Sequence, residues 1–296
     1  MTTPFSPLAI SAAKTIAQYH IAPEASPHGQ HAVEVPQAEH RIQLVNHWRI
    51  PRGSRVLEIG CGQGTLTAVL AEAVGPDGHV DAVDPGSPDY GAPWTLGQAQ
   101  AHLSAGPVGG RIAWHNAEPE AFLAGRDGGD KWDFVVLGHC IWYFAAPEVL
   151  TSLLVALRGR AGTLLIAEYA LTATEKAAVP HVLASMARAF LEAHNEASEA
   201  NIRCLLSPGV ITDLAQESGW HLDSEAIVVP GEALQDGSWE TGSVKSKSFL
   251  EEITKHVDDT AVQSLLRSSR DAVTRAVVAL HENDVRTMDV WVARFR

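Results

Sequence analysis

The sequence predicts an α/β protein built around a parallel β-sheet. From residue 55 to about residue 167, short apolar runs alternate with helical segments, which is typical of βαβ units with right-handed crossovers. A glycine-rich turn, VLEIGCGQG, joins the first apolar run to the first helix of this pattern. Two further strand-like segments follow near the C-terminus, interrupted by long helical stretches. The sheet is therefore expected to carry helical insertions.

Composition excludes several classes of partner. The chain has 296 residues and is 46% hydrophobic, which is enough apolar material for a sizeable core. Its net charge is −13, and we find no cluster of Lys and Arg, so neither a nucleic acid nor an anionic membrane surface is an expected partner. The three cysteines are far apart and odd in number, which favours reduced thiols. With no long apolar run and no signal-peptide pattern, a cytoplasmic location is expected.

The first 52 residues are interpreted as an N-terminal helical cap segment. Leu8–Tyr19 and Gln37–Trp48 have helical patterns, and the second has a continuous apolar face. Pro51-Arg52-Gly53 breaks the helix and marks the start of a core that spans residues 53–296.

Five strands and four helices are expected in the alternating part of the core. The strands are Arg55–Ile59, His79–Val83, Arg111–His115, Trp132–Leu137 and Thr163–Ala167. The helices are Thr65–Val74, Thr95–Leu103, Pro119–Leu123 and Pro147–Leu157.

The regular alternation of strands and helices ends after Ala170. Long helical patterns over Glu175–Asn201 and Val244–His281 suggest insertions at about 172–206 and 240–283, and a helix at Pro208–Ser218 separates them from the strands Trp220–Val229 and Met288–Phe295. The insertions are interpreted as lid elements over a substrate. Dimerisation, giving a homodimer, or plain cover of the core are equal alternatives. A lid with Met186 and Phe190 facing inward would suit an apolar substrate.

The glycine-rich turn is typical of nucleotide binding. Gly60 suits a tight turn, Gly62 allows a ligand to approach the backbone, and Gly64 allows close packing. The dinucleotide pattern G-x-G-x-x-G needs a glycine where Thr65 stands, so the spacing is unsuited to a diphosphate. Glu58 would repel a diphosphate but suits the ammonium group of a ligand that carries an amino acid. A glycine turn without a ligand is the alternative.

Residues 56–64 resemble motif I, E/D-x-G-x-G-x-G, of class I S-adenosylmethionine-dependent methyltransferases, and the resemblance in strand order extends over residues 55–170. More loosely, the insertions and the segment Asp84-Pro85-Gly86-Ser87 resemble fungal small-molecule methyltransferases of secondary metabolism. The resemblance implies a Rossmann-like, seven-stranded, mostly parallel sheet with an antiparallel last strand, S-adenosylmethionine as cofactor and S-adenosylhomocysteine as product. Carried over to this sequence, the motif's cofactor-binding residues are Glu58, Gly60, Cys61, Gly62 and Gly64.

Asp84 is the expected partner of the cofactor's ribose. It ends the second strand, close to the spacing of about 20 residues after the glycine turn at which an acidic residue binds ribose hydroxyls. A solvated turn aspartate is the alternative. Asp81 competes for the role, but it lies in mid-strand, and its side chain should point to the opposite face from that of Ala82.

The resemblance also assigns residues at the ends of the third and fourth strands. It implies that Asn116 accepts a hydrogen bond from the adenine amine and that the Ala117 N–H donates to the ring. Many family members have Asp where this chain has Asn116. Gly138 and His139 are implied to lie beside the methyl donor.

Methyl transfer to a hydroxyl, thiol or ammonium group needs a base, and histidine suits this role. His139 is the first candidate, with a purely pocket-shaping role as the alternative. His28 and His31, in PHGQH, are the second candidates, because the N-terminal segment often folds over the site in this family. No third Cys or His lies near this H-x-x-H pair, so no metal is expected. Glu168, after the fifth strand, is either a pocket carboxylate or a surface charge.

Tyr19, Trp142, Tyr143, Met186 and Phe190 are candidates for the substrate pocket, although part of the aromatic cluster is expected to belong to the core. The favoured function is methyl transfer to the O, N or S atom of a small, apolar molecule. The alternative is a methyltransferase-like regulatory or scaffold protein that binds the cofactor without turnover. A pocket for the acceptor beside the methyl-bearing sulfur would distinguish the two.

Overall fold

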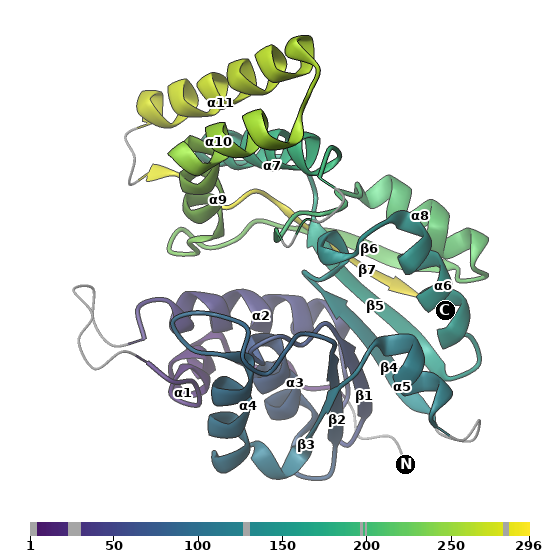
Figure 1. The fold of residues 1–296 in the computed structure, drawn as a ribbon. Coiled ribbons are helices and arrows are strands. Elements are labelled where there is room, and N and C mark those ends of the chain that lie inside the picture. Colours follow the sequence, from purple (N-terminus) through teal and green to yellow (C-terminus); the bar gives the residue numbers. More distant parts are fainter. Residues whose placement is uncertain (1–4, 23–30, 127–130, 196–197, 199, 281–283) are drawn as a thin grey trace.

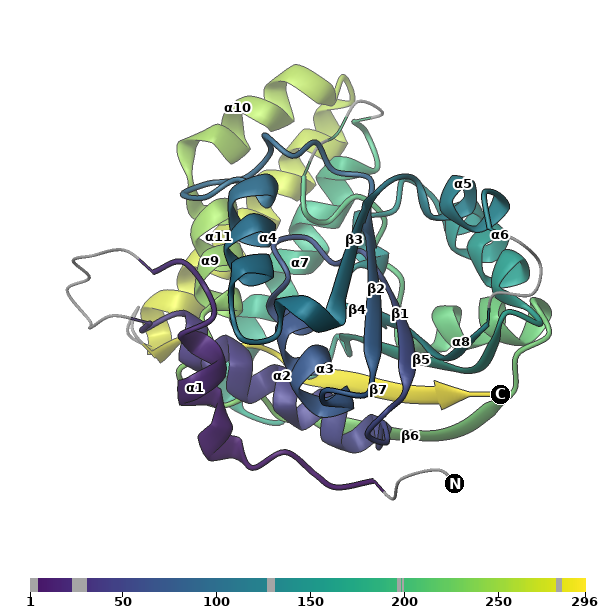
Figure 2. The same cartoon turned by 90° about the horizontal axis from the view of Figure 1, so that it is seen from below.

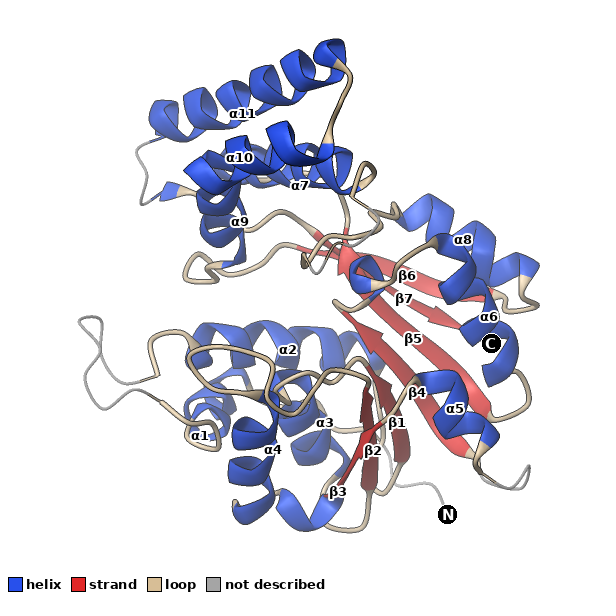
Figure 3. Cartoon of the chain, viewed as in Figure 1, coloured by secondary structure: helices blue, strands red, loops and turns tan. Residues whose placement is uncertain are grey.

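A seven-stranded sheet forms the centre of the computed structural model, which describes residues 5–22, 31–126, 131–195, 198, 200–280 and 284–296 (Figures 1 and 3). The strand order is β3-β2-β1-β4-β5-β7-β6. The strands are β1 (Arg55–Ile59), β2 (His79–Asp84), β3 (Ile112–Asn116), β4 (Trp132–Gly138), β5 (Ala161–Tyr169), β6 (Leu222–Val228) and β7 (Val290–Phe295). Strand β7 runs antiparallel to its neighbours β5 and β6, whereas the pairs among β1 to β5 are parallel, so the expected mostly parallel sheet with an antiparallel last strand is confirmed.

Helices cover both faces of the sheet (Figure 2). One face carries α1 (Ala13–Ala17), α2 (Glu34–Trp48), α3 (Thr65–Val74) and α4 (Leu96–Ala105), and the other carries α5 (Pro119–Ala124), α6 (Pro147–Leu157) and α8 (Pro208–Glu217). Successive strand residues alternate between the two sides. Val56 packs in the apolar core between the sheet and α1–α4, whereas Leu57 packs in the core on the opposite face, beside α5, α6 and α8. Because both faces are covered, most residues of the central strands are apolar, with Glu58 and Asp81 as buried exceptions.

A helical cap with its own apolar core stands over one edge of the sheet (Figure 1). It consists of α7 (Val179–Glu192), α9 (Asp236–Lys245), α10 (Lys247–His256) and α11 (Thr260–Leu280). Helix α7 follows the end of β5, and α9–α11 precede β7, whose first residue Val290 pairs with Tyr169 at that same end. Both insertions therefore emerge at the carboxyl edge of β5, where ligands of open α/β sheets bind.

The helix boundaries within the insertions differ from the prediction. The stretch Glu175–Asn201 was expected to be one long helix, but α7 ends at Glu192 and the chain then turns through His194 and Asn195, which have low helix propensity. The C-terminal stretch divides into three helices, and Ser246 caps α10 by accepting the Phe249 N–H at 3.2 Å. The bounds of β1, α3 and α6 agree with the prediction.

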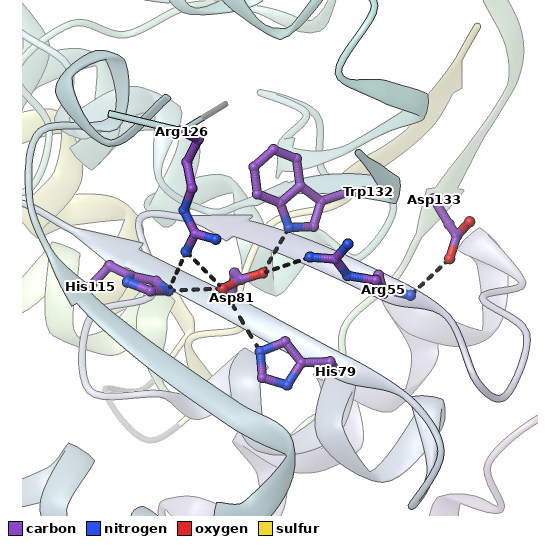
Figure 4. Close-up of polar contacts among 7 residues, drawn as sticks. All are labelled: Arg55, His79, Asp81, His115, Arg126, Trp132 and Asp133. Carbon is purple, nitrogen blue, oxygen red and sulfur yellow. Dashed lines mark hydrogen bonds and ion pairs between the residues drawn. The ribbon is translucent and has the colours of Figure 1, made fainter. Parts of the chain in front are cut away.

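Asp81, in the middle of β2, anchors a polar network away from the glycine turn (Figure 4). Its buried carboxylate accepts hydrogen bonds from the Trp132 indole and pairs with His115, both at 2.8 Å. Arg55, His79 and Arg126 lie within 4.0 Å of it. Burial raises the Asp81 pKa, but these hydrogen bonds and charges outweigh that effect and lower it. The contacts of the Asp81 carboxylate are therefore with these side chains and not with the glycine turn.

No helix in the described part of the chain is both long enough and apolar enough to cross a membrane.

Candidate active site

The glycine turn is closed on one side and open on the other. The N–H of Gly60 donates to the Val83 carbonyl at 2.8 Å, which joins the end of β1 to β2. A Cβ added to Gly60 would lie 2.5 Å from the Cβ of Cys140, so no larger residue fits there. Gly62 has a φ of +52° and nothing within 4 Å of where its Cβ would be. The bare backbone at Gly62 is thus the part of the turn that a ligand can approach.

Three other predicted residues support the turn rather than present polar groups. Burial raises the pKa of Cys61, so its thiol stays protonated. Gly64 precedes α3 and packs closely against Trp114 of β3. Gly138 ends β4, where a Cβ would meet Leu66.

Asp84 fastens the turn to the end of β2. Its Oδ2 accepts the Gly62 N–H and its Oδ1 accepts the Gly86 N–H, both at 2.8 Å. The amide nitrogen of Asn116 donates to the carbonyls of Asp84 at 3.1 Å and Gly86 at 2.6 Å, which leaves only its amide oxygen for a ligand. The Ala117 N–H, expected to face adenine, donates instead to the Asp84 carbonyl at 3.2 Å. That expectation is corrected: strand pairing uses this donor.

Glu58 is a buried carboxyl group below the turn. The residue is 2% exposed, and its Oε2 has no hydrogen-bond partner among the described residues. Burial raises the Glu58 pKa to about 8; a hydrogen bond with the Thr67 side chain and the Arg41 charge oppose the rise, and the Asp84 carboxylate adds to it. A carboxyl group in this state gains a partner when a cationic ligand reaches it.

His139 follows β4 in a strained conformation. Its φ is +55°, a region that residues other than glycine rarely adopt and that is frequent at functional sites. Its N–H donates to the Ala167 carbonyl at 2.9 Å. Its Nε2 lies 3.1 Å from the Nε2 of His40, and its Nδ1 lies 3.6 Å from a carboxylate oxygen of Glu168. The imidazole is therefore held between a second imidazole and a carboxylate.

Glu168 and His40 are both fixed by burial. Glu168 is 1% exposed and accepts the N–H groups of Ile141 at 3.1 Å and Tyr169 at 3.0 Å, so it is a buried carboxylate and not a surface charge. Burial, with the charges of Arg41 and His139, lowers the His40 pKa well below its usual value. His40 is consequently neutral at physiological pH.

Tyr169 joins the site to the cap. Its ring lies 4.6 Å from that of His139 and 5.1 Å from that of His181, between ring centroids. Its hydroxyl donates to Asp236 at 2.8 Å, and the other carboxylate oxygen of Asp236 accepts the Gln37 amide at 2.9 Å. One carboxylate thus connects the end of β5 with the start of α9 and with α2.

His181, on α7, forms an aromatic wall together with His139 and Tyr169. Its Nδ1 accepts the Met288 N–H at 3.0 Å, and its Nε2 is buried without a hydrogen-bond partner among the described residues. Burial lowers the His181 pKa to about 4, so the ring is neutral.

Two predicted aromatic residues lie near this wall with different surroundings. Trp142 is buried in the core: its ring lies 5.4 Å from Tyr169, and its indole N–H donates to the Leu206 carbonyl at 2.9 Å. Tyr143 is 48% exposed at the end of the turn that follows His139.

The other three predicted pocket residues lie elsewhere. Met186 and Phe190 are 52% and 40% exposed on the outer face of α7, because the small residues Ala184 and Ala187 form the face that packs within the cap. Tyr19 packs at the end of α1, where the charges acting on its hydroxyl are Glu72 and Arg111. Both of these charges lie toward the amino ends of the strands. The inward lid and the Tyr19 entrance were therefore wrong.

Of the two histidines of PHGQH, only His31 can be compared with the site. His31 precedes α2, and its Nδ1 lies 4.0 Å from the Glu34 carboxylate. His28 lies outside the described residues.

Five residues of the site were not identified from the sequence, namely His40, Arg41, Tyr169, His181 and Asp236. Tyr169 had a usable signal, since it ends a predicted strand at the carboxyl edge of the sheet. His40 and Arg41 lie on a predicted helix, but nothing in the sequence indicated which edge of the sheet that helix approaches. His181 lies in a predicted helical insertion and Asp236 just before the other, and nothing in the sequence indicated that either approaches the base.

The chain is similar to known methyltransferases in sequence and to a solved structure in sequence and fold. A family model described as a methyltransferase domain matches residues 30–225. Methyltransferases phomM′ and phomM of Diaporthe leptostromiformis are 27% and 26% identical, each over 89% of this chain and 84% of the relative. The solved structure of a cyclopropane-fatty-acyl-phospholipid synthase-like protein from Lactobacillus casei is 30% identical, with a TM-score of 0.84 over 97% of this chain and 99% of that one. Since the family model spans more than half of the chain, the protein belongs to the methyltransferase domain family and is a class I methyltransferase.

Proposed function

We propose that the enzyme transfers a methyl group from S-adenosylmethionine to a hydroxyl, thiol or amine of a small molecule, with His139 as the base. The observation that carries the proposal is the placement of His139 at the carboxyl end of β4, between neutral His40 and buried Glu168. When bound, the cofactor supplies a methyl group on a sulfonium, ready for in-line displacement.

The residues of the turn fit this cofactor. The exposed backbone at Gly62 accepts a close-lying ligand, and Glu58 suits its ammonium group. Each carboxylate oxygen of Asp84 has a second lone pair, so Asp84 can accept ribose hydroxyls while it holds the turn. The amide oxygen of Asn116 supports the expected contact with the adenine amine.

The proton of the acceptor has a defined place to go. His139 Nδ1 has no hydrogen-bond partner among the described residues, and it faces Glu168. Protonation of His139 gives an imidazolium that the Glu168 carboxylate stabilises from the Nδ1 side, while neutral His40 can accept the N–H at Nε2. Both partners of the charged form of His139 are thus in place.

The cap restricts the access of water to this base. Asp236 holds α9 and α2 together above Tyr169, and Tyr169 covers the ring of His139. Keeping acceptor and methyl group aligned in a dry site can supply most of the rate enhancement.

The surroundings of His139 favour an acceptor with polar groups. The side chains around His139 include the imidazole of His40, the carboxylate of Glu168 and the phenol of Tyr169, whose ring lies 5.1 Å from that of His181. Met186 and Phe190, which would suit an apolar acceptor, are 52% and 40% exposed on α7 and give it no support. The fungal methyltransferases among the relatives support a place in secondary metabolism.

Isothermal titration calorimetry and a turnover assay test the proposal. The protein should bind S-adenosylmethionine and not NAD. His139→Asn should keep that affinity but lower turnover by roughly 10²- to 10⁴-fold with a responsive acceptor from a panel of small phenols, thiols and amines. His47→Asn, at an exposed position of α2, is the matched control. Binding of NAD alone would refute the cofactor assignment, and unchanged turnover in His139→Asn would refute the base. Binding without turnover on any acceptor would favour a regulatory protein.

A further inference from the structure

Helix α9 turns an acidic and aromatic side toward the site. Asp236, Trp239 and Glu240 are spaced i, i+3 and i+4, so they lie within an arc of about 100° on one side of the helix. Asp236 accepts hydrogen bonds from Tyr169 of β5 and Gln37 of α2, so this side faces the carboxyl edge of the sheet. Trp239 is 49% exposed, which is a large open indole for a side chain next to a packed cap.

Two tyrosines from the core of the fold lie close to Glu240. Tyr143 follows β4 and is 48% exposed, and Tyr90, in the loop between β2 and α4, is 53% exposed. Burial of its hydroxyl raises the Tyr143 pKa, and the charges of Glu240, Tyr90, Glu168 and Asp236 add to the rise. Since such charges act mainly within about 10 Å, the Tyr143 phenol lies at one rim of the site with the carboxylates.

The carboxylates at this rim are not neutralised by a cation. Asp236 accepts hydrogen bonds from neutral donors, and Glu240 forms no ion pair within the described part of the chain. The positive charge that acts on Glu240 is that of Arg188, which already pairs with two other carboxylates of the cap. Burial and the Asp236 charge raise the Glu240 pKa, while Arg188 and a hydrogen bond with Asn201 oppose the rise. Negative charge is therefore in excess here.

A buried nitrogen without a partner lies at the inner end of this rim. The His139 side chain is only 9% exposed, and its Nδ1 has no hydrogen-bond partner among the described residues. Nδ1 lies 3.6 Å from Glu168, beyond hydrogen-bond range, and the charge of Glu168 also acts on Tyr143. This nitrogen is thus placed to take a proton from a group bound at the rim.

On the basis of the proposed methyl transfer, we infer that the acceptor is an amine whose ammonium group is bound by Glu240 against the rings of Tyr143 and Trp239. Carboxylates and the faces of aromatic rings both attract ammonium groups. A neutral hydroxyl would leave the excess negative charge unbalanced, and the thiolate form of a thiol would be repelled by it.

The bound ammonium group must lose a proton before its nitrogen can react. His139 accepts that proton, and Glu168 stabilises the imidazolium. The freed lone pair of the amine then forms the bond to the methyl carbon, the electron pair of the carbon–sulfur bond stays on sulfur, and the positive charge passes from the sulfonium to the methylated nitrogen.

Three probes with one carbon skeleton test the inference, namely 2-phenylethylamine, 2-phenylethanol and 2-phenylethanethiol. In calorimetry at neutral pH, with the protein saturated with S-adenosylhomocysteine, the amine should bind roughly 10-fold or more tightly than the other two. Glu240→Gln should weaken the amine by roughly 10- to 100-fold, the value of a charged hydrogen bond, and leave the alcohol unchanged. Tyr143→Leu should weaken the amine more than the alcohol, because it removes the aromatic face.

Controls separate this contact from net charge and from folding. Asp271→Asn removes an exposed carboxylate from α11 and should leave the affinity for the amine unchanged. Without ligand, Glu240→Gln should keep the Tm of the wild type, because the amide can still bond to Asn201. Both variants should bind S-adenosylhomocysteine like the wild type, since neither residue belongs to the glycine turn.

The outcomes separate the inference from the proposed function. If the wild type binds the alcohol or the thiol as tightly as the amine, the inference is overturned while the proposed function stands. The same holds if Glu240→Gln leaves the amine unaffected, or if Asp271→Asn weakens it equally. If the protein does not bind S-adenosylmethionine at all, the proposed function itself fails.

Discussion

At the scale of single residues, Glu58 shows how burial sets up a binding group. The backbone of β1 places its carboxyl group under the glycine turn, where Oε2 finds no partner among the described residues. With a pKa of about 8, the group is mostly protonated at neutral pH. The fold therefore retains a proton here that the unfolded chain releases above its own, lower pKa.

We predict that this proton makes stability depend on pH. Between the unfolded pKa of about 4.5 and the folded value of about 8, the folded state binds one more proton, so the free energy of unfolding falls as pH rises. The slope should reach about 1.4 kcal/mol per pH unit. Glu58→Gln should flatten the curve, which urea unfolding at pH 6.5 to 8 measures. Buried His20 and His181, whose pKa values are lowered from 6.5 to about 4, act in the opposite direction between about pH 4 and 6.5, below the pH range of this measurement.

Glu251→Gln is the matched control, because it removes an exposed carboxyl group from α10. Its pH curve should follow that of the wild type. A Glu58→Gln curve parallel to the wild type over this range would show that Glu58 is already ionised in the folded state.

At the scale of elements, the glycine turn separates packing from binding. Gly60 touches Cys140, whereas Gly62 faces open space, although both have positive φ. An added methyl group should therefore reduce stability at Gly60 and cofactor binding at Gly62.

Gly60→Ala should unfold the protein or lower its stability by several kcal/mol, because the new Cβ would lie 2.5 Å from Cys140. Gly62→Ala should cost only about 1–2 kcal/mol of backbone strain but block the approach of the cofactor. Thermal melts with calorimetry on the same samples measure both effects. Gly159→Ala, also at positive φ with nothing near its Cβ but remote from the site, controls for strain alone. Equal loss of cofactor affinity in Gly62→Ala and Gly159→Ala would remove Gly62 from the site.

At the scale of the whole molecule, Asp236 connects parts of the chain that are far apart in sequence. Its two oxygens accept from Tyr169 of β5 and Gln37 of α2, and it begins α9 of the cap. Cap and N-terminal helix therefore depend on one carboxylate for their mutual position over the base.

Asp236→Asn should loosen this junction, because an amide has one acceptor oxygen and would turn its NH₂ toward the other donor. We expect a loss of about 1–3 kcal/mol and faster hydrogen exchange in both α9 and the first half of α2. Exchange followed by mass spectrometry measures it. Glu232→Gln, which removes an exposed ion pair with Arg286 just before α9, should leave both helices unchanged. Faster exchange in α9 alone would mean that the hydrogen bond between Gln37 and Asp236 does not stabilise α2.

The sequence by itself determined the sheet, the glycine turn and His139 as a candidate. These depend on patterns that act over short distances along the chain: alternation and apolar runs for the strands, and the spacing of three glycines and one acid for the turn. It did not indicate that strand pairing would occupy the Ala117 N–H, or that small residues would let α7 turn Met186 and Phe190 outward.

Only the tertiary structure decided what surrounds the base. His40 and His139 are 99 residues apart, and Gln37 and Asp236 are 199 apart, so no local pattern relates them. Their meeting depends on where α2 and the cap pack against the carboxyl edge of the sheet. The physical reason is that periodicity indicates which face of an element is buried, whereas the partner of that face is selected by the packing of the whole chain.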